Sequence, residues 1–195
     1  MFGLGAIICS VAKICVSIIS CQVVSKAIQA IGRALGIIKD KDQIEDLGDR
    51  ALQAEEKGIT LDKYSTFDEF KQALDNFELN PDKTKATSLE EKEKKFIEIC
   101  ALGMKEQNPN LKVEEMITLM DKNPSLFTPE RATSLGRIVV EDPNVVNDIV
   151  GFLSGNERNG KSLKNGRDAL VKVEMEQNPN LTLDEASAIV YGKKQ

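Results

Sequence analysis

One stretch of the chain has the residue types and the spacing of a phosphate-binding loop. Gly155, Gly160, Lys161 and Ser162 satisfy the pattern G-x-x-x-x-G-K-[ST]. In such loops backbone N–H groups surround the phosphates, the Lys reaches the β- and γ-phosphate oxygens, and the Ser hydroxyl holds Mg²⁺. The pattern requires a buried strand before it, whereas residues 142–153 are typical of a short helix. Nucleotide binding is therefore an alternative to a simpler interpretation, in which Ser162 caps a helix.

Residues for other catalytic or metal chemistry are scarce. The sequence contains no His, which is the commonest general base and metal ligand. Cys9, Cys15 and Cys21 recur at intervals of six, a spacing that spreads them around a helix, and Cys100 lies in a predicted helix. This distribution favours small buried apolar residues over a metal site or a disulfide framework. We expect no enzymatic activity, no metal and no cofactor.

The first 38 residues are apolar and lack any acidic side chain, and their only charges are Lys13, Lys26 and Arg33. Because the net charge of the whole chain is −5, the acidic excess lies in the rest of the chain. An apolar run of this length must be buried in lipid or against partner subunits, and its positive charge suits an anionic lipid surface. The acidic remainder has no basic cluster for nucleic acid. We therefore expect protein partners, self-association through residues 1–38 or a lipid bilayer, and no nucleic acid.

Polar side chains form two stripes on a helical wheel of this apolar segment. The first stripe consists of Ser10, Lys13, Ser17 and Ser20, and the second of Gln22, Ser25, Lys26, Gln29 and Arg33. The stripes are rotated well away from each other, so one straight helix cannot present both. The sequence predicts a break near residues 20–22, between a very apolar first helix and an amphipathic second one that ends at Gly36.

Three environments fit the first helix. Residues 2–24 are long enough to span about 30 Å of hydrocarbon, although a Lys at mid-bilayer, here Lys13, costs roughly 2.5–3.5 kcal/mol. Alternatively, the stripe that contains Lys13 lines a multimeric pore, or the helix joins a bundle of identical helices. The choice between membrane and bundle stays open at this stage.

The segment lacks the order of a secretory signal, because its first Lys lies at position 13, inside the apolar run. Residues 18–21, Ile-Ile-Ser-Cys, resemble the lipobox of bacterial lipoproteins, and this resemblance implies lipidation at Cys21. However, another apolar helix follows Cys21, where lipoproteins have a flexible polar tether. We expect a cytoplasmic or membrane-associated protein that is not conventionally secreted, with lipidation of Cys21 as an alternative.

From residue 39 onward, cap signals and apolar periodicity predict a succession of helices. Asp40 or Asp42 is expected to cap a helix that is closed by Gly58, and Ser88 and Glu91 form a capping box before another helix. No segment alternates polar and apolar residues over the length of a strand. The predicted fold class is all-α, with an apolar N-terminal helix or broken helical hairpin followed by an array of short helices.

A repeated string marks corners between these helices. Glu-Gln-Asn-Pro-Asn-Leu occurs at residues 106–111 and again at 176–181, and a looser copy, Asp-Lys-Asn-Pro-Ser-Leu, occupies residues 121–126. The Pro disfavours the helical conformation for the Asn before it, and the Leu returns the chain to the core. The two matching copies predict a duplicated helix–turn–helix unit.

These features predict three parts: an apolar N-terminal segment over residues 1–38, a helical linker domain over 39–87 and a helical repeat domain over 88–195. The leading hypothesis is a non-catalytic structural or assembly component. Its apolar helices are buried in a helical bundle or membrane, and its acidic body binds protein partners. A bacterial or phage-like multi-subunit particle would suit such a chain. The alternatives are a membrane-active pore-forming effector and a nucleotide-binding protein that uses the loop at residues 155–162.

Overall fold

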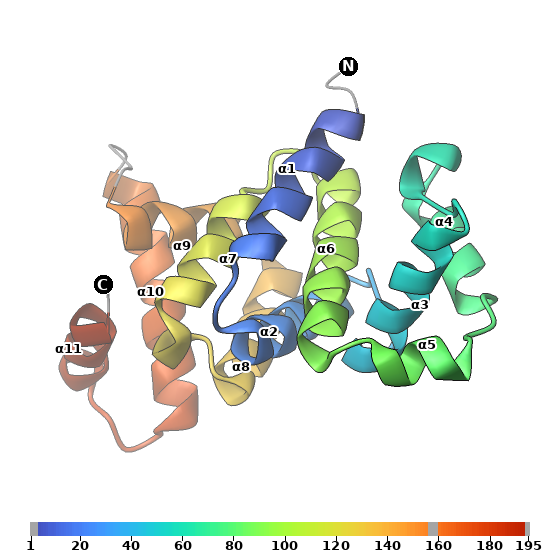
Figure 1. Cartoon of the computed structure of the whole chain (residues 1–195). Coiled ribbons are helices and arrows are strands. Elements are labelled where there is room, and N and C mark those ends of the chain that lie inside the picture. Colours follow the sequence, from blue (N-terminus) through green and yellow to red (C-terminus); the bar gives the residue numbers. More distant parts are fainter. Residues whose placement is uncertain (1–3, 156–159, 194–195) are drawn as a thin grey trace.

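The computed structural model describes residues 4–155 and 160–193, and every regular element within these ranges is helical. This confirms the predicted all-α class. The α-helices are, in chain order, α1 (Leu4–Ser17), α2 (Cys21–Ala34), α3 (Ile44–Glu56), α4 (Phe67–Asp75), α5 (Pro81–Ala86), α6 (Leu89–Gln107), α7 (Val113–Lys122), α8 (Pro129–Glu141), α9 (Val145–Ser154), α10 (Gly160–Gln177) and α11 (Leu183–Lys193), with two short 3₁₀ turns, η1 (Leu61–Lys63) and η2 (Pro124–Leu126). Figure 1 shows α3, α4 and α5 at one end of the molecule and α10 and α11 at the other.

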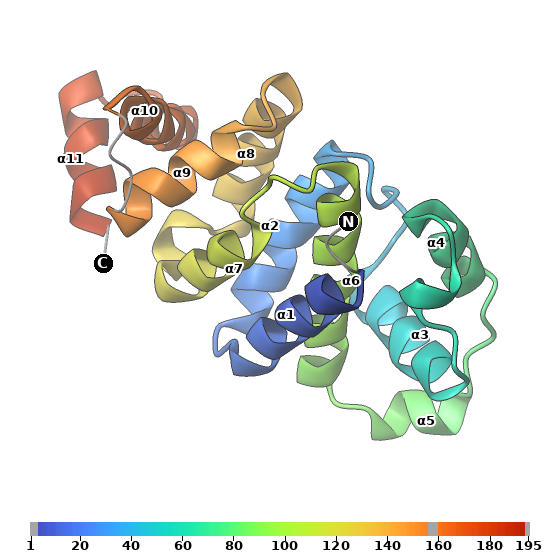
Figure 2. The ribbon, with the colours of Figure 1, turned by 90° about the horizontal axis from the view of Figure 1, so that it is seen from above.

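The apolar N-terminal segment is broken at residues 18–20, close to the predicted position. The break separates α1 from α2, and Figure 2 shows that the two helices run in different directions. The Oδ1 atom of Asp121 accepts hydrogen bonds from the backbone N–H groups of Ile19, at 3.1 Å, and Ser20, at 2.6 Å. A carboxylate at this place complements the positive end of a helix dipole. Asp121, which belongs to α7, therefore fixes where α2 begins.

α2 packs against α6 and α8 in the middle of the molecule (Figures 1 and 2). Its inward face is apolar, because Cys21, Val24, Ala27, Ile28 and Ile31 are each at most 5% exposed. The chain's own helices thus supply the burial that the sequence assigned to lipid or to partner subunits. For α2 that expectation is wrong, since its apolar face is already covered.

One cluster of buried apolar side chains runs from Val11 in α1 to Val190 in α11. Members of the cluster come from all three predicted parts, 1–38, 39–87 and 88–195. Burial of apolar surface is the main favourable term in folding, so these parts are stabilised by a shared core. The core includes Ile38, at the first predicted boundary, whereas residues 81–90, around the second boundary, contribute no buried member.

The length of the N-terminal helices bears on membrane insertion. α1 and α2 have 14 residues each, whereas a helix that crosses a bilayer needs about 20 apolar residues. No helix in the described part of the chain combines the length and the apolar composition for a membrane crossing. The break at residues 18–20 interrupts residues 2–24, the segment that the sequence predicted as a possible membrane-spanning helix.

Local end signals set several helix boundaries as predicted. Gly36 follows α2 with a φ of +73°, a left-handed conformation that favours glycine, and Gly58 follows α3 in the same way with a φ of +77°. The capping box before α6 is also present: the Glu91 N–H donates to the Ser88 hydroxyl at 3.2 Å, and the Ser88 N–H donates to the Glu91 carboxylate at 2.9 Å. These boundaries depend on residues that are neighbours in sequence.

The predicted Asp cap of α3 is wrong. The residue before α3 is Gln43, and its side chain makes no capping hydrogen bond. The Asp42 side chain instead accepts a hydrogen bond from the Lys39 N–H at 2.9 Å and forms an ion pair with Lys71 of α4 at 3.1 Å. The Asp42 carboxylate, which the local sequence pattern predicted as a helix cap, is thus bound to Lys71, a residue distant in sequence.

The three Asn-Pro corners of the repeated string, at Asn108, Asn123 and Asn178, share one hydrogen-bond pattern. In each, the Asn N–H donates to the carbonyl four residues earlier, and the N–H of the Leu donates to the Asn carbonyl. The distances are 2.9–3.0 Å at Asn108, Asn123 and Asn178. Asp142, which also precedes a Pro, makes the same two bonds at 3.0 and 3.1 Å. Corners of one kind therefore join α6 to α7, α7 to α8, α8 to α9, and α10 to α11.

Two helix pairs approach each other at a glycine. A Cβ atom on Gly48 of α3 would lie 2.0 Å from the carbonyl oxygen of Lys92 in α6, and a Cβ on Gly166 of α10 would lie 2.1 Å from the carbonyl oxygen of Asp148 in α9. Real Cβ atoms do not come this close to a backbone oxygen. The spacing between these helices therefore depends on the missing side chain.

Candidate functional site

The first polar stripe predicted from the sequence lies mainly on the molecular surface. Ser10, Lys13 and Ser17 are exposed on one face of α1, and the Ser17 hydroxyl donates to a backbone carbonyl of the same helix at 2.8 Å. Ser20 is partly buried in the break before α2. The structure thus groups three of these side chains and places the fourth at the start of the next helix.

Cys21, the predicted lipidation site, has its side chain inside the protein. It is 5% exposed, its Sγ donates to the Ile18 carbonyl at 3.4 Å, and burial raises the pKa of the thiol. Burial also raises the pKa of Cys15, to about 12. Cys9 is the exposed member of the four cysteines. Attachment of a lipid at Cys21 would require the start of α2 to open.

The stretch that matches the phosphate-binding pattern, residues 155–162, begins at the end of α9 and extends into the start of α10. Gly155 ends α9 with a φ of +68°, residues 156–159 are outside the described residues, and Gly160 begins α10, where Lys161 is exposed. The Ser162 hydroxyl donates a hydrogen bond to the carboxylate of Asp148 in α9. The element before the loop is thus a helix, where a phosphate-binding loop has a strand. Within the described ranges, no three His, Cys, Asp or Glu side chains gather where a metal ion could be held.

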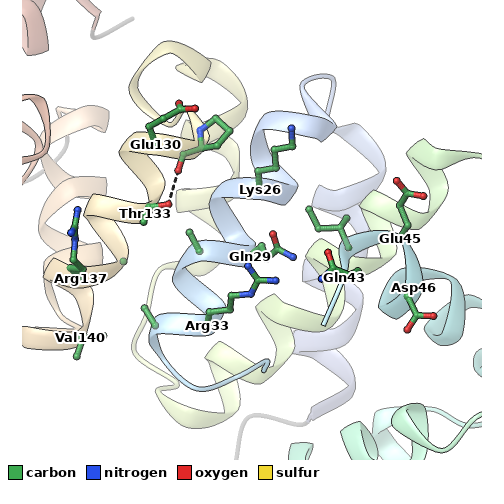
Figure 3. A pocket seen from close by; sticks show the side chains of 15 residues that line it. Lys26, Gln29, Arg33, Gln43, Glu45, Asp46, Glu130, Thr133, Arg137 and Val140 are labelled. Atoms are coloured by element: carbon green, nitrogen blue, oxygen red, sulfur yellow. Dashed lines mark hydrogen bonds between the residues drawn. The ribbon is translucent and has the colours of Figure 1, made fainter. Parts of the chain in front are cut away.

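A groove of about 990 Å³ opens above α2. α2 forms its floor, α8 forms one wall, and the start of α3 forms the other (Figure 3). The lining residues are Lys26, Gln29, Ala30, Arg33, Ala34, Gln43, Ile44, Glu45, Asp46, Pro129, Glu130, Thr133, Gly136, Arg137 and Val140. The volume is at the upper end of the range for ligand sites.

Small residues line the groove where α2 meets α8. A Cβ atom on Gly136 of α8 would lie 3.1 Å from the carbonyl oxygen of Ala30 and 3.3 Å from the Cβ of Ala34. The absence of larger side chains lets the two backbones approach. Val140, one turn further along α8, is 57% exposed, which leaves apolar surface open at this end of the groove.

The floor carries three members of the second polar stripe, Lys26, Gln29 and Arg33 (Figure 3). Nη2 of Arg33 donates to the backbone oxygens of Asp40, at 2.9 Å, and Asp42, at 3.0 Å. Nε2 of Gln29 donates to the same Asp42 oxygen at 3.1 Å. These bonds tie the turn before α3 to α2.

The α3 wall is acidic and firmly attached. Glu45 and Asp46 lie in the first turn of α3, and Asp46 accepts a hydrogen bond from Nε of Arg50 at 2.8 Å. The side chains of Asp42 and Lys71, which form the ion pair behind this wall, are each 8% exposed. A buried pair of this kind resists rearrangement, because separating it leaves a charge without a partner.

The α8 wall combines charges of both signs. The pKa of the Glu130 carboxyl is lowered, because its own backbone N–H and the Thr128 side chain form hydrogen bonds to the carboxylate. Arg137 pairs with Glu176 of α10 at 3.1 Å. The two ends of this wall therefore differ in charge, with the carboxylate at the start of α8 and the guanidinium two turns later.

The groove has the groups for binding a ligand by shape and charge. Its lining includes neither Cys nor His, and its one hydroxyl, on Thr133, donates to the Pro129 carbonyl at 2.9 Å. The fixed charges and the small apolar surfaces are the features left for a ligand to contact.

Comparison with known proteins gives no match to a family model, to a curated protein or to a solved structure.

Proposed function

We propose that this chain is a non-catalytic assembly component, which binds a helical segment of a partner protein in the groove over α2. The single observation that carries the proposal is the groove itself, where small residues and charged walls lie between helices. Grooves between helices bind amphipathic helices. Here small side chains of the partner would lie over Ala30 and Ala34, and its charged side chains would meet the charged residues of the floor and the walls. A bacterial or phage-like multi-subunit particle would provide such a partner.

The rigidity of the walls favours this function. The turn before α3 is held by the bonds of Arg33 and Gln29 and by the Asp42–Lys71 ion pair. A preformed site loses less conformational freedom when a ligand binds, and more of the contact energy then appears as affinity.

Selection of peptides on the full-length chain tests the proposal. Helical peptides would be selected from a random display library, and their dissociation constants measured for the wild type and for Thr133→Trp. Thr133 is exposed on the α8 wall, so a Trp there fills the groove, and we expect at least about tenfold weaker binding. Glu141→Trp, on the same helix but outside the groove, is the matched control. Peptides that bind both variants as tightly as the wild type would contradict the proposal.

A second candidate contact is self-association through the end of α1 and the break that follows it. Val16 and Ile19 are 74% and 89% exposed, and exposed apolar side chains of this size favour association. We expect the double variant Val16→Asp/Ile19→Asp to lower the sedimentation-average mass if the native chain is an oligomer held by this face. An oligomer that the double variant leaves intact would rule out this contact.

A further inference from the structure

The floor of the groove carries two positive charges, on Lys26 and Arg33, that form no ion pair within residues 4–155 and 160–193, although Lys26 lies close enough to Glu93 and Glu130 for its charge to favour the ionised form of each carboxyl. The side chain of Lys26 forms no hydrogen bond or ion pair with any described residue, and the side-chain hydrogen bonds of Arg33 go to backbone oxygens. Neither residue is a member of an ion pair in the described part of the chain, although the whole chain has a net charge of −5. The Nε atom of Arg33 is also buried without an acceptor. The charges of Lys26 and Arg33, both of which line the groove, are therefore not neutralised by an ion pair within the described part of the chain.

These two charges have the spacing of two helical turns. Lys26 and Arg33 are seven residues apart in α2 and project from one side of it (Figure 3). A helix rises 1.5 Å per residue, so the two positions are about 10 Å apart along the axis. A second helix that lies along α2 brings residues seven apart beside them, because a heptad returns to nearly the same face.

The walls argue against an extended polyanion such as RNA. Glu45, Asp46 and Glu130 place three carboxylates around the floor (Figure 3), and a continuous phosphate backbone would be repelled by them. A helix can place acidic residues on the face toward α2 and basic residues on the edge toward Glu45, which makes no ion pair with any described residue.

Resting on the proposed function, we propose that the groove selects an amphipathic helix with two acidic residues seven positions apart on the face toward α2 and a basic residue on the edge toward α3. The carboxylates pair with Lys26 and Arg33, and the basic residue pairs with Glu45. Small side chains between the two carboxylates lie over Ala30 and Ala34. The partner helix is thus defined by charges opposite to those of Lys26, Arg33 and Glu45.

Designed peptides test the pattern on the full-length protein. The probe is an alanine-rich helix of about 20 residues, with Glu residues seven apart, a Lys on one edge and a fluorophore for anisotropy. An isomer with the Glu residues five apart, on different faces, has the same composition. We expect the first peptide to bind about tenfold more tightly than the isomer, because only it places both carboxylates beside α2.

A charge reversal gives the matched test within the protein. Lys26 is exposed and its side chain forms no hydrogen bond or ion pair with the residues that the structure describes, so Lys26→Glu should weaken the probe about tenfold and improve binding of a peptide with Lys in place of both Glu residues. Lys41→Glu changes the net charge equally, outside the groove, and should leave both affinities unchanged. Equal binding of the two isomers, or no effect of Lys26→Glu, would overturn the acidic pattern.

The outcomes separate this inference from the proposed function. If library-selected helices bind Thr133→Trp more weakly but bind Lys26→Glu as tightly as the wild type, the groove binds helices and the acidic pattern is wrong. If no helix depends on Thr133, the proposed function is wrong as well. A single-stranded RNA oligonucleotide that competes with the probe and fails to bind Lys26→Glu would replace the helix as the occupant and overturn the inference.

Discussion

Asp42 shows how one residue links the groove to the rest of the fold. Its backbone oxygen accepts hydrogen bonds from Gln29 and Arg33, and its carboxylate pairs with Lys71. Lys71 also donates to Asp75 in the same helix. Lys71 therefore connects α4 to the turn before α3, because it contacts the carboxylates of both Asp42 and Asp75. The sequence indicated an Asp with a structural task near the start of α3. It could not show that Asp42 pairs with Lys71, about 30 residues later, because that contact exists only in the folded chain.

The pH dependence of stability tests this ionic group. Burial alone raises the pKa of Asp75, but the hydrogen bond and charge of Lys71 and the charge of Lys39 outweigh it, so the net pKa lies below its ordinary value of 3.8. The lowered pKa makes Asp75 stabilising above pH 3.8, and this contribution disappears as the pH falls through the native pKa. We expect the free energy of unfolding in urea to fall more steeply below that pH for the wild type than for Asp75→Asn. Parallel curves for the two proteins would mean that Lys71 does not stabilise the Asp75 carboxylate.

Thiol reactivity tests the burial of the cysteines. Cys9 is exposed, whereas Cys15, Cys21 and Cys100 are buried, and burial raises the pKa of each of these three thiols. Since the thiolate is the reactive form, we expect iodoacetamide to label one site quickly in the native protein, and all four in denaturant. Mass spectrometry identifies the sites, and Cys9→Ser should remove the fast one. Rapid labelling of Cys21 in the native protein would show that the start of α2 opens, and that the Cys21 thiol is accessible for lipidation.

The helices and their ends were the most predictable elements. The capping box at Ser88, the glycines after α2 and α3, and the three Asn-Pro corners depend on hydrogen bonds between residues close in sequence, so the sequence contains all that determines them. The fourth corner at Asp142 makes the same bonds with Asp in place of Asn. A search for Asx-Pro would have found it together with Asn80-Pro81, where the Asn side chain instead caps α5. The close approach of α9 and α10 has no such local signal, because it depends on which helices become neighbours.

The α9–α10 contact gives a prediction for that element pair. A Cβ at Gly166 would lie 2.1 Å from the Asp148 oxygen, so Gly166→Ala must push the helices apart, and we expect a loss of about 2–3 kcal/mol in the free energy of unfolding. Gly192→Ala in α11 is the control, since nothing lies within 4 Å of its Cβ position, and Ala there should be neutral or stabilise by up to about 1 kcal/mol. Equal stabilities of the two variants, measured by urea denaturation, would show that α9 and α10 are not packed so closely.

At the scale of the whole molecule, the sequence predicted the second polar stripe but not its surroundings. Lys26 and Arg33 were visible as cations in a segment without a carboxylate, which was the signal for an unpaired charged surface. The walls of the groove come from α3 and α8, and their placement beside α2 follows from the packing of all these helices. The same packing covers the apolar face of α2. Apolar composition alone could not distinguish a face buried by the chain itself from one buried by lipid.

The central place of α2 determines what removal of residues 1–38 should do. Ile28 and Ile31 are fully buried, and truncation of a single large aliphatic side chain in a core costs about 2–5 kcal/mol. Loss of the whole helix therefore exceeds the total stability of about 5–15 kcal/mol that is usual for a protein. We expect the truncated chain to show no cooperative thermal transition by circular dichroism. Removal of residues 182–195 is the control, because α11 packs mainly on α10 at one end of the array, and a cooperative transition should survive there at lower temperature. A 39–195 chain that melts cooperatively as a monomer would show instead that the N-terminal helices are a separable part, and that their burial in this fold is not what holds the other helices together.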